Sequence, residues 1–118
     1  MIKIAVIMQH SPFASGVARE AQDMLFALAA VEHQLTVIYR GDALYQLLTT
    51  RSDANVGCKD FTVAQKLFGL YEIEQVLVDA AELVQYHVDP ALCRVPVQQC
   101  SLSELQAHLH QQHHILRF

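Results

Sequence analysis

Hydrophobic residues follow two spacings along this chain, and the two spacings alternate. Short runs that are apolar almost throughout occur at residues 2–8, 35–39 and 75–78. Such runs are typical of central strands in a parallel sheet, because both faces of those strands are covered. Between the runs, apolar residues recur every three or four positions, as in a helix with one buried side. Strands that alternate with helices predict an α/β fold.

Five helices are predicted, each preceded by a side chain that can accept a hydrogen bond from the first helical turn. The expected N-cap residues, in chain order, are Ser15, Asp42, Asp60, Asp79 and Ser101. Ser101 is followed three residues later by Glu104, which is the spacing of a capping box. Gly69 is predicted to end the third helix, because glycine adopts the left-handed conformation most easily. Residues 49–59 are polar without periodicity and predict an exposed loop.

Two more strands are predicted near the end of the sequence. Residues 94–97 include Pro96, which lacks a backbone N–H, so this strand should lie at a sheet edge or a bulge. Residues 115–118 form a short final strand. Together with the three apolar runs, these strands predict a three-layer α/β/α sandwich around a mainly parallel five-stranded sheet. The length predicts one domain over residues 1–118.

The composition is apolar for so small a domain. Hydrophobic residues make up 53% of the 118 and charged residues only 17%. A small domain has a high ratio of surface to volume, so part of this apolar surface is expected to contact another subunit. The alternative is that a sheet covered on both faces accounts for the apolar strands by itself. The helices favour an interface, because several are apolar on more than one side.

Charge and targeting signals narrow the functional classes. The net charge is −4 and the basic residues are scattered, so direct binding of nucleic acid is not expected. The sequence has neither the ~20-residue apolar run of a membrane span nor the features of a signal peptide. Its three cysteines show no CxxC spacing, which argues against a disulfide framework or a zinc site. We therefore expect a cytosolic protein with reduced thiols.

Two clusters of residues suggest ligand sites, but each has a simpler interpretation. Ser11, Ser15 and Gly16 precede a helix N-terminus, which favours anions, but the loop lacks a dinucleotide or Walker fingerprint. A plain turn is favoured over a phosphate or flavin site. The second cluster consists of His108, His110, His113 and His114. Only two of these have i,i+4 spacing, and only if the helix continues, so a polar helix end is favoured over a metal site.

The candidates for a catalytic nucleophile and for a general base are as weak as those for a ligand site. Cys58 lies in the polar loop, whereas Cys93 and Cys100 flank the predicted edge strand. Cys100 directly precedes a helix and is the best thiol candidate, although a small buried apolar role is favoured. Asp79 ends the third apolar run, where α/β domains open their ligand sites. An Asp at that position is more simply a helix N-cap than a general base.

Several segments of the chain resemble the DsrF-like branch of the DsrE/DsrF family in their order and spacing. They are the first strand with the Pro12 turn and residues 41–48 (GDALYQLL), 59–61 (KDF), 66–75 (KLFGLYEIEQ) and 115–118 (ILRF). The resemblance implies a subunit of a TusBCD-like sulfur-relay complex, a dimer of heterotrimers with TusB-like and TusD-like partners. Such a relay passes persulfide sulfur through a TusE-like acceptor toward 2-thiolation of the tRNA wobble uridine.

The resemblance also implies where the chemistry of such a complex takes place. In the TusD-like subunit, a cysteine near the end of the corresponding strand carries the persulfide. Residues 76–81 of this chain read VLVDAA and contain no cysteine. A non-catalytic structural subunit without cofactor or metal is therefore expected. The alternatives are a subunit that carries sulfur on Cys100 or Cys93, and a flavodoxin-like small-ligand binder.

The surface that would contact the partner subunits is predicted from four aromatic and aliphatic residues. They are Tyr45, Phe68, Leu70 and Tyr71. Aromatic residues are enriched at the centres of protein interfaces. The alternative is that the same side chains cover the sheet.

Overall fold

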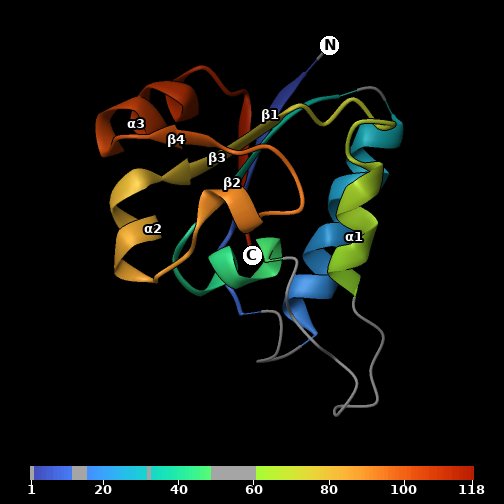
Figure 1. Ribbon diagram of the computed structural model, residues 1–118. Coiled ribbons are helices and arrows are strands. Elements are labelled where there is room, and N and C mark those ends of the chain that lie inside the picture. Colours follow the sequence, from blue (N-terminus) through green and yellow to red (C-terminus); the bar gives the residue numbers. More distant parts are fainter. Residues whose placement is uncertain (1, 12–15, 32, 49–60) are drawn as a thin grey trace.

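Five parallel strands form the centre of the protein (Figure 1). The computed structural model describes residues 2–11, 16–31, 33–48 and 61–118. The strands are β1 (Lys3–Met8), β2 (Gln34–Tyr39), β3 (Gln75–Asp79), β4 (Gln98–Cys100) and β5 (His114–Arg117). They lie in the order β4-β3-β2-β1-β5, and each neighbouring pair is parallel. The predicted five-stranded α/β sheet is confirmed, and in the described residues it is parallel throughout.

The order of the strands explains why helices cover both faces of the sheet. The described helices are α1 (Val17–Ala30), η1 (Gly41–Leu47), η2 (Phe61–Leu67), α2 (Ala80–Gln85), η3 (Pro90–Leu92) and α3 (Leu102–His110). From β1 to β4 the chain advances toward one edge, and α3 then returns it to β5 at the other edge. Right-handed crossovers place connections on one face during the advance and on the other during the return. Accordingly, α1 and α3 lie on opposite sides of the sheet (Figure 1).

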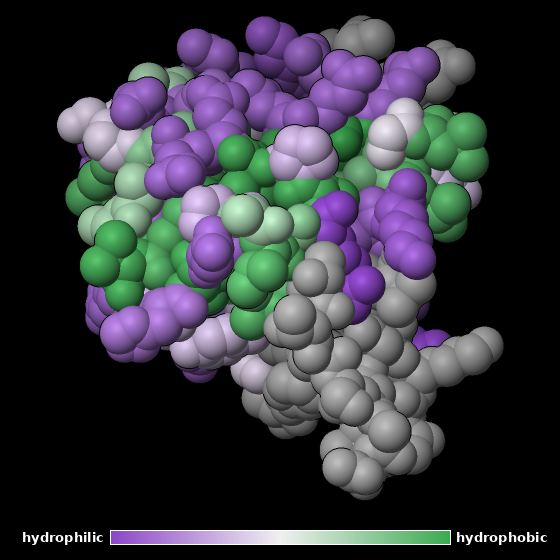
Figure 2. Space-filling view, viewed as in Figure 1, coloured by the Kyte–Doolittle hydropathy of each residue, from purple (hydrophilic) through white to green (hydrophobic). Residues whose placement is uncertain are grey.

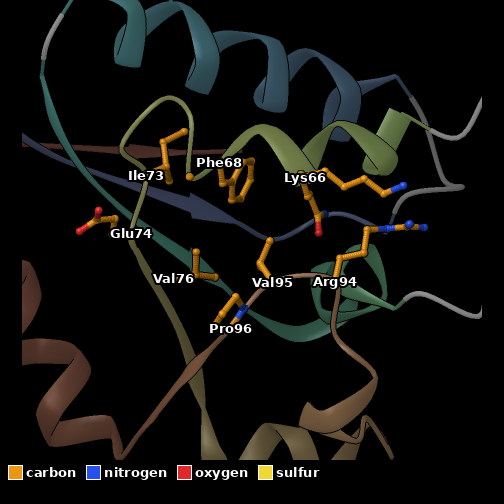
Figure 3. A pocket seen from close by; sticks show the side chains of 10 residues that line it. Lys66, Phe68, Ile73, Glu74, Val76, Arg94, Val95 and Pro96 are labelled. Atoms are coloured by element: carbon orange, nitrogen blue, oxygen red, sulfur yellow. The ribbon is translucent and has the colours of Figure 1, made fainter.

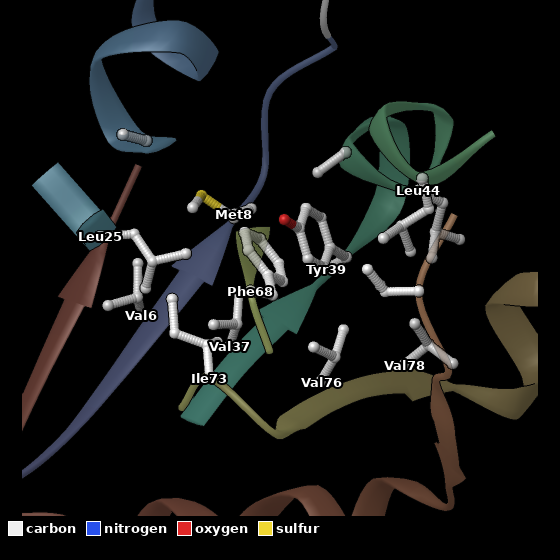
Figure 4. Close-up of a cluster of buried hydrophobic side chains, with 14 of the residues drawn as sticks. Val6, Met8, Leu25, Val37, Tyr39, Leu44, Phe68, Ile73, Val76 and Val78 are labelled. Carbon is white, nitrogen blue, oxygen red and sulfur yellow. The ribbon is translucent and has the colours of Figure 1, made fainter. Parts of the chain in front are cut away.

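The core consists of two unequal clusters, one on each face. The larger includes Met8, Tyr39 and Phe68 together with side chains of α1, η1 and α2 (Figure 4). The smaller joins alternate strand residues such as Ile38 to Leu105 of α3. Successive strand side chains point to opposite faces, so both clusters draw on the same strands. This is why the strands read as continuous apolar runs.

Two of the predicted helix caps are confirmed. The Asp79 side chain accepts a hydrogen bond from the Ala81 N–H at 2.9 Å, and Ser101 and Glu104 form a complete capping box. The hydrogen bonds from Ser101 lower the pKa of Glu104. The stabilisation that the ionised Glu104 carboxylate contributes to the cap is therefore fully present above the ordinary carboxyl pKa. It is lost as the pH falls through the lowered pKa of Glu104.

The other predicted caps differ or lie outside the described residues. The helix η1 begins after Arg40, and Asp42 lies in its first turn, so the prediction that Asp42 is the cap was wrong. Gly16 is the N-cap of α1, one residue after the predicted Ser15, which lies outside the described residues. Asp60 and the predicted loop at 49–59 also lie outside them.

The turn after η2 corrects the prediction for Gly69. Gly69 is not left-handed; the left-handed residue is Glu72, with φ of 60°. The Ile73 N–H donates to the Phe68 carbonyl at 2.8 Å, which is the long bond of a Schellman-type ending. The turn therefore extends through Leu70 and Tyr71 before it closes, and it presents both side chains at the surface.

The fourth strand is shifted from its predicted position. It was predicted at residues 94–97 but spans Gln98–Cys100. Pro96 cannot donate to a neighbouring strand, so pairing with β3 begins only beyond it. Its predicted location at an edge of the sheet is confirmed.

Candidate functional site

The carboxyl ends of β2 and β3 carry a charged cluster of three side chains. Arg40 follows β2, Asp79 ends β3, and Glu82 lies in the first turn of α2. The Arg40 Nε donates to Glu82 Oε1 at 2.7 Å, and its Nη2 lies 3.6 Å from Asp79 Oδ2. The Gly41 N–H also approaches Glu82 Oε1, at 3.4 Å. One guanidinium thus bridges two carboxylates at the edge where α/β proteins usually bind ligands.

Asp79 is fully engaged by these contacts. Its Oδ1 accepts from the Ala81 N–H and its Oδ2 faces Arg40, while the residue is only 8% exposed. A general base must keep an oxygen available to the proton that it removes. Asp79 is therefore the N-cap of α2, as predicted.

Cys100 lies closer to this cluster than the sequence indicated. It ends β4 directly opposite Asp79 in the strand register. Its side chain is 1% exposed, packs beneath α3 and approaches the Gln98 carbonyl at 3.8 Å. Burial raises the pKa of the Cys100 thiol, and the negative charges of Glu104 and Asp79 raise it further. The register of a shifted strand could not be read from the sequence, but the predicted buried apolar role is confirmed.

Cys93 also has a weakly acidic thiol. It is half-buried, and its Sγ lies 3.9 Å from the Asp89 carbonyl. Burial raises the pKa of Cys93, and the Asp89 carboxylate adds to the effect. Thiolate is the nucleophilic form, so neither described cysteine has the environment of an activated thiol. Cys58 lies outside the described residues.

Alkylation kinetics should reveal the raised pKa of Cys93. In a variant with Cys58→Ser and Cys100→Ser, iodoacetamide should react more slowly with the folded chain than with the same chain in urea at neutral pH. The folded-state rate should still rise above about pH 9.5, where a free thiol with a pKa of about 8.5 is almost fully ionised. As the pH rises, Cys93 ionises first in the unfolded chain, where its pKa is the ordinary one. The free energy of unfolding should therefore fall as the pH rises past that ordinary thiol pKa. Equal rates in the folded and unfolded chains would contradict the assignment.

The C-terminal histidines are not arranged as the metal interpretation requires. The helix α3 ends at His110 and β5 begins at His114, so their i,i+4 spacing does not lie on one helix. The Nδ1 of His113 accepts a hydrogen bond from the Lys3 N–H at 2.8 Å. Among the described residues, no group of three or more His, Cys, Asp or Glu side chains could hold a metal ion.

The loop that the sequence suggested as an anion site is described only at its two ends. Ser11 is half-buried and Gly16 is the exposed N-cap of α1, while residues 12–15 lie outside the described part. Gly16 caps the helix without a side-chain hydrogen bond. The plain turn that was favoured over a ligand site in this loop therefore stays a prediction.

The four residues predicted for an interface lie in three different environments. Phe68 is 2% exposed and packs edge-on against Phe26, with ring centroids 5.7 Å apart. Its side chain belongs to the larger core cluster. Tyr45 is half-buried and stacks edge-on against Tyr86. Leu70 and Tyr71, in contrast, are 78% and 38% exposed.

Leu70 and Tyr71 border an open groove of about 600 Å³, hereafter the Leu70 groove. Its lining residues are Ala29, Ala30, His33, Gln34, Leu70, Tyr71 and Glu72. It runs between the end of α1 and the turn after η2, and the Tyr71 ring packs 5.1 Å from that of Phe26. Figure 2 shows hydrophobic side chains gathered at the upper right, over these two elements. Of the four residues predicted for an interface, Leu70 and Tyr71 are the two that the fold leaves exposed, and both line this groove.

None of the described helices is long and apolar enough to cross a membrane.

The architecture and the sequence together identify the class of protein. A family model described as the DsrE/DsrF-like family matches residues 2–118. The chain therefore belongs to the DsrE/DsrF-like family. The crystal structure of the ychN protein from Escherichia coli superimposes with a TM-score of 0.86 and covers 100% of both chains. At 16% identity, that likeness supports the fold alone.

Within the family, the chain is similar to proteins named TusC. It is 34% identical to the TusC homolog of Vibrio parahaemolyticus over 118 residues, which is 100% of both chains. It is 33% identical to TusC of Klebsiella pneumoniae (strain 342) over 119 residues, again 100% of both. The family expected from the residues is confirmed.

Proposed function

We propose that this protein is a non-catalytic, structural subunit of a TusBCD-like sulfur-relay complex. It assembles in the cytoplasm with TusB-like and TusD-like subunits as a dimer of heterotrimers. The complex passes persulfide sulfur to a TusE-like acceptor, toward 2-thiolation of the tRNA wobble uridine. This subunit contributes surface and rigidity, while a thiol on another subunit carries the sulfur.

The single observation that carries the proposal is the chemistry at the end of β3. A persulfide carrier needs an accessible thiolate, because sulfur moves by thiolate attack on a sulfur atom. At the strand end this chain has Asp79, whose carboxylate is held by Arg40 and by the Ala81 N–H. The adjacent thiol of Cys100 is buried and has a raised pKa. A strand end without an accessible, acidic thiol supports a subunit that does not itself carry sulfur.

The exposed apolar side chains support the assembly part of the proposal. Leu70, Val84 and Val31 are large aliphatic residues that are 78%, 76% and 62% exposed. Of these three, Leu70 lines the Leu70 groove, where Tyr71 is also exposed, and apolar surface exposed at a groove is typical of interaction sites. The Leu70 groove is therefore our choice for contact with a partner subunit.

Co-expression with the TusB-like and TusD-like chains tests the proposal directly. The native mass should equal that of two copies of each of the three subunits, and Cys93→Ser with Cys100→Ser should leave both this mass and tRNA thiolation intact. A chain that stays monomeric in the presence of both partners would refute the proposal. Loss of thiolation from an intact complex would instead assign a sulfur-carrying role to one of the two cysteines.

A further inference from the structure

A second concave site lies near the start of β3, whereas Asp79 and Arg40 lie at strand ends. It is a cavity of about 360 Å³ between η2 and the segment that leads into β4 (Figure 3). Its floor is apolar and consists of Phe68, Ile73, Val76, Val95 and Pro96. The volume lies within the usual range for pockets that bind small ligands or single anchoring side chains.

The two ends of the cavity differ in charge. Lys66 and Arg94 extend in the same direction at one end, and Glu74 lies at the other (Figure 3). Lys66 is exposed, and it forms no ion pair with any described residue. An anionic group is therefore favoured at the Lys66 end and disfavoured at the Glu74 end. This polarity would fix the direction in which a ligand enters.

A buried hydrogen-bond acceptor belongs to the same cavity. Gln65 is 0% exposed and lines the site. Its Nε2 donates to the Gln46 carbonyl at 2.8 Å, which fixes the orientation of the amide. Its Oε1 has no hydrogen-bond partner among the described residues. A buried acceptor without a donor is costly in a folded protein, so this atom favours a ligand that brings an N–H group.

We propose that this cavity binds the carboxyl-terminal residue of a partner polypeptide. An apolar side chain contacts Phe68 and Val95, the backbone N–H donates to Gln65 Oε1, and the α-carboxylate lies near Lys66. The amide N–H and the α-carboxylate of one residue share a single Cα. Gln65 and Lys66 both line the cavity, so one residue of a ligand can contact both groups. The inference rests on the proposed function only in taking the occupant to be a partner chain.

Peptide titrations monitored by ¹H–¹⁵N NMR on the full-length chain test this site. Acetyl-Gly-Gly-Leu with a free carboxylate should bind in the millimolar range and shift the amide resonances of Phe68, Ile73 and Val95. The same peptide with a C-terminal amide should bind roughly ten-fold more weakly, because it loses a charge-assisted contact. Lys66→Gln should weaken the acid and leave the amide unchanged. Arg19→Gln is the matched control, since it removes an exposed positive charge from α1, and it should change neither affinity.

Three results would overturn the inference. They are the absence of shifts at the cavity, equal binding of the acid and the amide, and binding of acetyl-leucine with exclusion of the longer peptide. The last result would indicate a small-molecule acid in place of a chain terminus. Peptide binding is measured without the partner subunits, so its failure would leave the test of assembly unaffected. Failure to assemble would likewise leave the measured preference for a carboxylate intact.

Discussion

Replacement of Phe68 by alanine is expected to lower the free energy of unfolding by about 3–5 kcal/mol. The side chain is 2% exposed and lies among Met8, Val37 and Tyr39 in the larger core cluster (Figure 4). Its ring also contacts Phe26 of α1. Truncation removes the buried aromatic surface and leaves a cavity that the sheet cannot fill. Urea unfolding monitored by circular dichroism, at an unchanged m value, gives the measurement.

Leu70→Ala is the control for this experiment, because Leu70 lies two residues away on the same turn. Its side chain is 78% exposed, so the free energy of unfolding of the monomer should change by no more than about 0.5 kcal/mol. Equal losses for the two variants would show that Phe68 is not a core residue. The pair therefore separates stability of the fold from contact with partners, two roles that the sequence pattern assigned to the same group.

The sequence predicted most of the fold because strands that are buried on both faces of a parallel sheet appear in the sequence as continuous apolar runs. Residues 2–8, 35–39 and 75–78 are apolar for that reason, and they correspond to β1, β2 and β3. The edge strands are less apolar and therefore harder to locate from the sequence. Pro96 correctly indicated an edge strand. The strand was nevertheless predicted too early in the sequence, because Val95 and Val97 are apolar and β-branched, whereas the actual strand is Gln98–Cys100. The actual strand has two glutamines, because an edge strand has less apolar cover.

Of the three side chains in the charged cluster, only Asp79 was singled out from the sequence, and Arg40 and Glu82 were missed. Asp79 is the cap that an Asp before a helix predicts, but its pairing with Arg40 joins residues 39 positions apart across two strand ends. No local pattern encodes such a contact. The interface set failed in a similar way at Phe68, because an aromatic residue near a turn is compatible with both core and surface. Only the closure of the turn at Glu72 decides that Phe68 points inward and Leu70 outward.

Substitution of Leu70 by glutamate is expected to weaken assembly with the partner subunits by at least about 30-fold, which corresponds to roughly 2 kcal/mol. The substitution would place a charge on an apolar groove that must lose water when a partner binds. The same exposure that makes Leu70 available to a partner makes it unimportant to the monomer, so the urea midpoint of the isolated chain should hardly change. Size-exclusion chromatography and native mass spectrometry of the co-expressed subunits provide the measurement.

Val84→Glu is the matched control, because Val84 is an aliphatic residue of nearly equal exposure, 76% against 78%, on a different element, α2. Both variants add one negative charge to an apolar surface, so a general effect of charge or solubility would weaken assembly equally in the two. Selective loss with Leu70→Glu would assign the partner contact to the Leu70 groove. Selective loss with Val84→Glu would move the contact to α2 and its neighbour Pro90, where a smaller groove of about 370 Å³ lies beside β4. In either case, the contact surface would be defined by comparing two substitutions that each replace an exposed aliphatic side chain with glutamate. Because neither side chain is buried in the monomer, a difference in fold stability would not explain the result.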